Sequence, residues 1–191
     1  MPSRELIEAV AVTAELCGRT FSEPAARVFV GDLAKFPEPV VIAALARCRR
    51  EVKGLLTVQD VVSRIDDGRP GVEEAWAMMP ISESQSVVWT EEMAKAFGAA
   101  LPLVARSDFV GARMAFKEAY TKAVTLARDA GAPVSWSASL GHDRHARKGV
   151  LREAVALGRL TLRQAQDHVP ELEAPAVESA LEAHIVKALT Q

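Results

Sequence analysis

Asp66-Asp67-Gly68-Arg69-Pro70-Gly71 is the stretch that divides this chain most strongly. It combines glycines and a proline, which interrupt helices, with aspartates, which favour turns. On both sides of it, apolar residues recur with the spacing that is typical of helices. We therefore predict a boundary here between an N-terminal domain, residues 1–66, and a C-terminal domain, residues 67–191.

The N-terminal part has the pattern of four short helices. Ser3 and Ser22 are placed to cap the first two, and Thr57 with Asp60 resembles a capping box at the start of the fourth. Gly18 is placed to end the first helix. Apolar stripes mark the first three helices: Leu6, Val10, Ala14 and Cys17; Ala26, Phe29, Val30 and Leu33; Val41, Leu45 and Cys48. Short connections between such helices predict a small four-helix bundle, with helices near residues 3–17, 22–33, 38–50 and 57–65.

The C-terminal part predicts a second, less regular helical domain, so the expected fold class is all-α. Residues 87–89 are a candidate extended segment, and residues 133–141 a loop or one short strand. The longest helix has a stripe that predicts a core-facing surface, formed by Phe109, Ala112, Phe116, Tyr120, Ala123 and Ala127. Helices are expected near residues 72–79, 90–98, 108–130, 143–157, 161–168 and 174–189.

Charge and composition limit the classes of function. The chain has 191 residues, 49% of them hydrophobic, and a net charge of −2. Because proteins that bind nucleic acid through phosphates usually carry a basic balance, any such role must rest on a local patch. The N-terminus lacks a signal-peptide pattern, and no apolar run approaches the ~20 residues of a membrane span. We expect a cytoplasmic protein without a membrane segment, in which Cys17 and Cys48 are free thiols.

Two basic clusters are the candidate DNA-binding residues. One is Arg47, Arg49, Arg50 and Lys53, at the end of the third helix, which with the fourth helix could form a helix-turn-helix. The other is Arg144, Arg147, Lys148 and Arg152. Arg144, Lys148 and Arg152 recur every four residues and share a helix face. A solvated charged face is the favoured interpretation and phosphate contact is the alternative, and the absence of interleaved aromatic residues argues against stacking on single strands.

No catalytic constellation emerges from the sequence. His142, Asp143 and His145 could face one metal ion, but a helix start capped by Asp143 is the favoured interpretation because a third histidine at a usual spacing is missing. Asp66 and Asp67 are explained by a turn. The chain has no P-loop pattern and no GxSxG. We therefore predict a protein that is not an enzyme and that uses no cofactor and no metal.

Tryptophan is concentrated in the C-terminal part, at Trp76, Trp89 and Trp136. Tryptophan anchors the cores of small helical domains and is also enriched at the energetic centres of interfaces. Core positions are favoured for at least two of the three, and binding of a partner protein is the alternative.

Four runs in the N-terminal part carry a family resemblance: residues 20–26, 33–36, 40–45 and 56–65. In their order, residues 5–66 resemble the N-terminal domain of phage-type loaders of the replicative helicase. The resemblance implies an accessory protein of phage or prophage DNA replication, which binds the hexameric helicase and has no ATPase activity of its own. Phe29 replaces the tryptophan-type anchor of that family, and a folded segment replaces its flexible helicase-binding tail. The remainder resembles uncharacterised proteobacterial prophage proteins.

Overall fold

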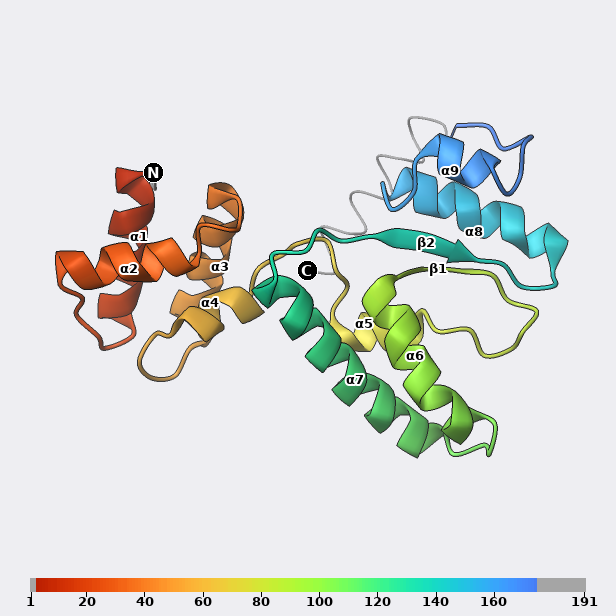
Figure 1. Cartoon of the computed structure of the whole chain (residues 1–191), viewed down its shortest axis with the longest axis horizontal. Coiled ribbons are helices and arrows are strands. Elements are labelled where there is room, and N and C mark those ends of the chain that lie inside the picture. The colour runs from red at the N-terminus through yellow and green to blue at the C-terminus, as the bar shows by residue number, and fades with distance from the viewer. Residues whose placement is uncertain (1–2, 175–191) are drawn as a thin grey trace. The chain divides into compact units, whose positions relative to one another are not determined.

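The computed structural model describes residues 3–174 of the chain, which are mostly helical and include one two-stranded sheet (Figure 1). The helix expected near residues 174–189 lies outside the described residues, apart from its first position. In chain order the elements are α1 (Arg4–Leu16), α2 (Glu23–Asp32), α3 (Glu38–Glu51), α4 (Val58–Ser63), α5 (Val72–Ala77), β1 (Val87–Thr90), α6 (Glu91–Val104), α7 (Phe109–Asp129), β2 (Trp136–Ser139), α8 (Arg144–Ala156) and α9 (Leu162–Gln166).

The contacts within the chain define two compact units. The first comprises the residues up to Arg69 together with Thr125–Pro133, and the second comprises Pro70–Val124 together with the residues from Val134 on. This division places the last turn of α7 in the first unit, which the sequence pattern did not indicate. The domain boundary that the sequence predicts between residues 66 and 67 stays a prediction.

In the first unit, α1 packs against α2 and α3, and α3 packs against α4 (Figure 1). The predicted caps are confirmed: the Ser3 hydroxyl accepts a hydrogen bond from the Leu6 amide at 3.0 Å, and Thr57 and Asp60 form a capping box. The predicted stripes are buried apart from Cys17, which is half-buried. The core consists of Leu6, Val10, Ala14, Phe29, Val30, Leu33, Val41, Ala44, Leu45, Cys48, Leu56, Val61, Val62 and Ile65.

In the second unit, the sheet lies between two apolar clusters. β1 and β2 pair antiparallel, with Val87 opposite Ser139 and Thr90 opposite Trp136. Successive side chains of a strand point to opposite faces. Val88 accordingly joins the cluster formed with α8 and α9, whereas Trp89 packs against the cluster formed by α5, α6 and α7. Figure 1 shows α8 on one side of the sheet and α6 on the other.

Two local predictions are wrong. Gly98 does not end α6, which continues to Val104. A glycine inside a helix costs only about 1 kcal/mol relative to alanine, and the buried residues Ala96 and Ala100 hold the helix on both sides of it. Phe109 was placed on the core stripe of α7 but is 55% exposed. Because helical side chains lean toward the N-terminus, the side chain of this first helical residue projects beyond the helix end.

The described part of the chain is mostly helical, as predicted, but it also contains a two-stranded sheet that an all-α fold lacks. The two segments that were candidates for extended structure pair with each other, although they are separated by α6 and α7. Each is four residues long. Four residues are too few to show a clear strand pattern. The pairing could not be predicted, because the two strands lie far apart in the sequence.

Candidate functional site

The first basic cluster is partly engaged within its own unit. The Arg47 guanidinium lies 3.5 Å from the Glu51 carboxylate, and Arg49 donates a hydrogen bond of 2.9 Å to the hydroxyl of the buried Thr13. Arg50 and Lys53 are exposed and form no ion pair with any residue in 3–174. Arg50 and Lys53 are therefore the two cations of this cluster that are available to pair with an external anion.

The helix after this cluster offers little for reading base edges. α4 has six residues, and only Gln59 and Ser63 among them are exposed. Its first turn contains Asp60, whose carboxylate accepts from the Thr57 amide at 2.9 Å. A recognition helix contacts bases with the residues near its N-terminus. The arrangement of α3 and α4 thus gives the helix-turn-helix alternative no specific support.

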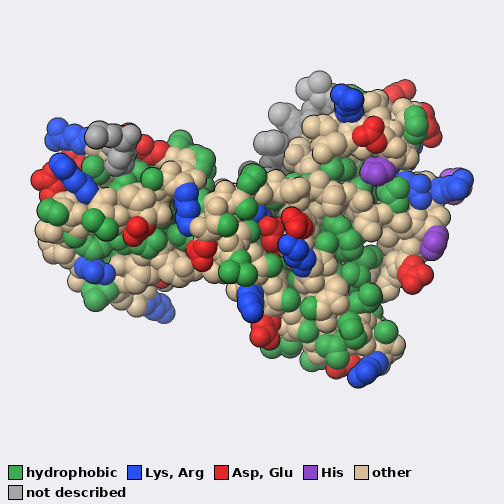
Figure 2. All heavy atoms as spheres, viewed as in Figure 1, with side chains coloured by type: hydrophobic (Ala, Val, Ile, Leu, Met, Phe, Trp, Pro, Cys, Tyr) green, Lys and Arg blue, Asp and Glu red, His purple; other side chains and the backbone are tan. Residues whose placement is uncertain are grey.

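The second basic cluster lies along α8. Arg144 and Arg152 are exposed, Lys148 is half-buried, and none of the three forms an ion pair within the described part of the chain. Arg147 differs from them because it donates a hydrogen bond of 2.9 Å to the Gly141 carbonyl, and its Nε is buried. Figure 2 shows Lys, Arg and His side chains gathered where α8 begins. Three of the four cations, Arg144, Lys148 and Arg152, are therefore available to a ligand, whereas Arg147 holds the loop before α8.

The start of α8 accounts for the Asp143 carboxylate. It accepts hydrogen bonds from the backbone amides of Ala146 at 3.0 Å and His145 at 2.9 Å, and these bonds lower the pKa of Asp143. The favoured interpretation of Asp143 as a helix cap is confirmed. Within residues 3–174, no group of three or more His, Cys, Asp or Glu side chains is arranged to hold a metal ion. The hypothesis of a metal site at His142, Asp143 and His145 gains no geometric support.

The three tryptophans are half-buried and pack against apolar clusters. Trp76 lies 5.3 Å from the Phe116 ring, measured between ring centroids, and Trp89 lies 5.8 Å from Phe97. The Arg159 guanidinium stands 4.7 Å from the centre of the Trp136 ring. All three side chains thus have intramolecular partners, and a role in binding another protein stays a prediction.

An apolar surface that the sequence reasoning missed lies where α6 ends and α7 begins. Four large apolar side chains are exposed there: Leu101, Phe109, Val110 and Met114. Val110 is 79% exposed and Met114 63% exposed, and the two are one helical turn apart on α7. In Figure 2, hydrophobic side chains gather over this end of α6 and α7, with basic and acidic side chains at its tip. We call these four residues the hairpin patch; the period of the α7 stripe could not reveal it, because Val110 and Met114 lie off that stripe.

Next to the hairpin patch, charges on α7 are already paired. Glu73 of α5 lies 2.7 Å from the Arg113 guanidinium and 2.5 Å from the Lys117 ammonium. Hydrogen bonds from Arg113 and Lys117 lower the pKa of Glu73 to about 2. The single Glu73 carboxylate thus compensates part of the charge of these two cations on the side of α7 next to the patch.

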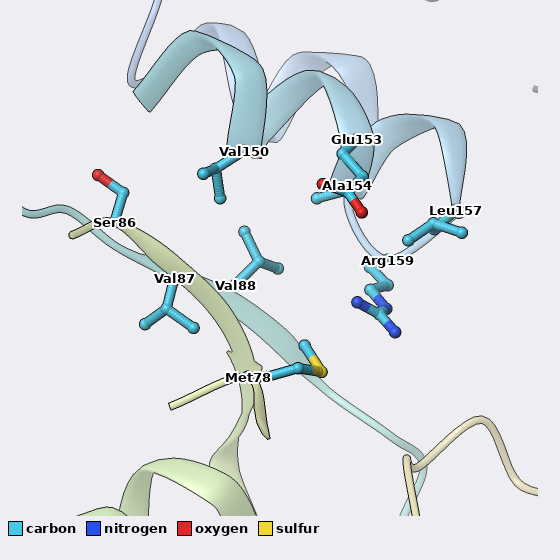
Figure 3. A pocket seen from close by; sticks show the side chains of 9 residues that line it. All are labelled: Met78, Ser86, Val87, Val88, Val150, Glu153, Ala154, Leu157 and Arg159. Atoms are coloured by element: carbon cyan, nitrogen blue, oxygen red, sulfur yellow. The ribbon is translucent and has the colours of Figure 1, made fainter. Parts of the chain in front are cut away.

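A cavity of about 200 Å³ lies between β1 and α8 (Figure 3). Its walls are mostly apolar, with Val87 and Val88 on one side and α8 on the other, and Glu153 and Arg159 are its charged residues. The Arg159 guanidinium lies 3.1 Å from the Glu74 carboxylate. Pockets for small molecules usually measure about 300–1,000 Å³, so this cavity is small for such a ligand.

The cysteines are free thiols, as predicted. Cys48 is completely buried in the first unit, whereas Cys17 is half-buried. Burial raises the pKa of the Cys48 thiol to about 11. Since the thiolate is the reactive form of cysteine, Cys48 is suited to packing and not to nucleophilic chemistry.

Within residues 3–174, no helix is both long enough and apolar enough to span a bilayer. Comparisons with protein-family models, with curated proteins and with solved structures find no match. The candidate functional surfaces are therefore those that the structure itself shows. They are the hairpin patch at the α6–α7 junction and the row of available cations on α8.

Proposed function

We propose that this protein is an adaptor of phage or prophage DNA replication, which binds the hexameric replicative helicase of the host and has no ATPase activity of its own. The hairpin patch is the surface proposed to make this contact. The partner is taken from the resemblance of residues 5–66 to helicase loaders, and the surface is taken from the structure of the second unit.

The exposure of the hairpin patch is the observation that carries the proposal. Val110 and Met114 are more than three-fifths exposed although both are large and apolar. Contiguous apolar side chains on the surface of a protein mark interaction sites far more often than isolated ones do. Burying a side chain of this size in an interface is worth about 1.5–3 kcal/mol. Four of them can therefore supply the centre of a protein interface.

The loader family uses a flexible tail for helicase contact, and this chain has a folded unit in that position. The proposal resolves the difference by assigning the contact to the hairpin patch instead of to a tail. The tryptophans, for which the sequence offered this role as the alternative to core positions, are half-buried and pack against apolar clusters of the same unit. In the hairpin patch, Phe109 offers a rigid aromatic anchor for a partner and Met114 a flexible apolar one.

The direct test is co-elution of the full-length chain with the purified host helicase on size exclusion. Both proteins are used at micromolar concentration, and the mixture is treated with nuclease so that DNA cannot bridge them. We expect a complex whose mass, measured by light scattering, exceeds that of the helicase hexamer. Separate elution of the two proteins would remove the proposal.

A further inference from the structure

α8 carries a row of cations that the adaptor role does not use. Arg144, Lys148 and Arg152 are spaced four residues apart, and positions four apart lie on one stripe of a helix. None of the three is paired with an acid in residues 3–174, whereas Arg113, Lys117 and Arg159 elsewhere in the same unit each are. The row is thus a concentration of uncompensated positive charge on one flank of one helix.

Arg144 stands in the first turn of α8, where a cation is unfavourable for the helix. The N-terminus of a helix carries partial positive charge and is stabilised by acids, so cations there cost stability. Each helix from α1 to α6 has an acid in its first turn, whereas α7, α8 and α9 have none. α8 begins with Arg144 and His145, directly after the Asp143 carboxylate that caps it.

The ligand that suits this row is a polyanion with regularly spaced charges. Four residues advance a helix by about 6 Å, so the row extends over about 12 Å. One strand of a DNA duplex presents a phosphate every ~3.4 Å along its axis, which places three or four phosphates within that length. We propose that Arg144, Lys148 and Arg152 bind the phosphate backbone of duplex DNA. This surface is independent of the helicase proposal, since it uses other residues.

Duplex DNA is favoured over a single strand. Proteins that hold single strands add aromatic side chains on which bases stack. Trp136 is the aromatic residue that packs against the apolar cluster formed with α8 and α9; it also packs against the second cluster of this unit, and the Arg159 guanidinium lies over its ring. Cations without a stacking platform recognise backbone charge, which predicts binding without sequence preference and with a strong dependence on salt.

Fluorescence anisotropy of the full-length chain with a labelled 20-base-pair duplex, between 50 and 200 mM salt, tests the proposal. Three neutralised phosphates predict a slope of about −2.7 in log affinity against log salt, which is about a fortyfold loss of affinity over that range. The triple variant Arg144→Gln/Lys148→Gln/Arg152→Gln should lose most of this slope. The charge-preserving variant Arg144→Lys/Arg152→Lys should keep it.

The matched control removes three other exposed cations that form no ion pair within residues 3–174, in Arg106→Gln/Lys122→Gln/Arg163→Gln. It should keep the wild-type slope, and loss of the slope in this control instead would overturn the assignment to α8. Absence of binding at 50 mM salt, an unchanged slope in the α8 triple variant, or tighter binding to a single strand or an RNA duplex would each overturn the proposal. A cooperative thermal transition, followed by circular dichroism, checks that each variant is folded.

Discussion

Asp67 lies between two arginines that come from distant parts of the sequence. The Arg69 guanidinium is 2.6 Å from its carboxylate, and the Arg128 guanidinium, at the end of α7, is 3.1 Å from it. Burial raises the pKa of Asp67, but the hydrogen bonds and charges of Arg128 and Arg69 outweigh burial and leave that pKa below its usual value. Arg128 also donates to the Ile65 carbonyl at 2.9 Å. The turn that divides the sequence is therefore held by an ion-pair network.

Removing the charge of Asp67 should destabilise the first unit. In Asp67→Asn, both arginines lose their shared anion, and breaking a buried pair costs about 3–5 kcal/mol. Because the Asp67 side chain retains 16% exposure, we expect a loss of about 2 kcal/mol in the free energy of unfolding, measured by urea denaturation. The neighbouring Asp66→Asn is the control, since Asp66 is exposed and, within residues 3–174, accepts a hydrogen bond from the Gly68 amide and forms no ion pair. Equal losses in the two variants would refute the role of the network.

The same carboxylate should make stability depend on pH. The pKa of Asp67 in the folded chain lies below the value of about 3.9 in an unfolded chain. Its contribution is then fully present above about pH 4 and is lost as the pH falls through the folded-state pKa. We expect the stability difference between wild type and Asp67→Asn to stay constant above about pH 5 and to shrink below about pH 4. A difference that persists unchanged down to about pH 2 is incompatible with this account.

At the scale of residues, local roles were predictable and distant partners were not. Asp66 and Asp67 were correctly assigned to a turn, because an aspartate bonds to a backbone amide two residues on. The partner Arg128 lies 61 residues from Asp67, and a single sequence carries no signal that joins them. The prediction that Phe109 is buried was wrong for a different reason. Its spacing fits the apolar stripe of α7, but no other element of the described chain covers the first turn of that helix at Phe109.

At the scale of elements, the loop before α8 depends on the absence of a side chain at one position. A Cβ at Gly141 would collide with the backbone of Ser84 and Gln85. The adjacent backbones are joined by hydrogen bonds, from the His142 amide to the Glu83 carbonyl at 3.2 Å and from the Asp143 amide to the Ser84 carbonyl at 3.0 Å. This junction fixes where α8 begins and therefore where its cations stand.

Gly141→Ala should separate these two segments. Forcing extra volume into a tight contact costs about 1–3 kcal/mol, so we expect a lower thermal midpoint by circular dichroism. Gly149→Ala is the matched control, because nothing lies within 4 Å of the Cβ position in that exposed part of α8. Alanine favours a helix over glycine by about 1 kcal/mol, so the control should raise the midpoint. A Gly141→Ala chain as stable as wild type would show that the contact is not required.

Helix starts were predicted well because their signals are local. Thr90 caps α6 and Thr161 caps α9 through side chains that bond within three residues. Pairing of β1 with β2 was not predicted, because the two strands contribute only four residues each. The hairpin patch was also missed, since a sequence pattern shows which face of a helix is apolar and not whether another element covers it.

At the scale of the whole molecule, the first unit needs a segment from far along the chain. The Arg69 guanidinium donates to the Ala132 carbonyl at 3.1 Å, and the Lys35 ammonium donates to the Asp129 carbonyl at 2.7 Å. A fragment of residues 1–69 lacks these partners. We expect the buried Cys48 thiol to react with a thiol reagent faster in that fragment than in the full chain, with Cys17→Ser in both. Equal rates would mean that residues 1–69 fold without the later segment.

The central claim is that the hairpin patch binds the replicative helicase. Isothermal titration calorimetry of the helicase with wild type and with Val110→Glu/Met114→Glu tests it most directly. Residues at the centre of an interface contribute at least about 2 kcal/mol, so the double variant should bind at least about thirtyfold more weakly. Leu126→Glu is the control, because Leu126 is also exposed on α7 but lies in the other unit, and it should bind as wild type does. Equal affinity of wild type and the double variant would contradict the account.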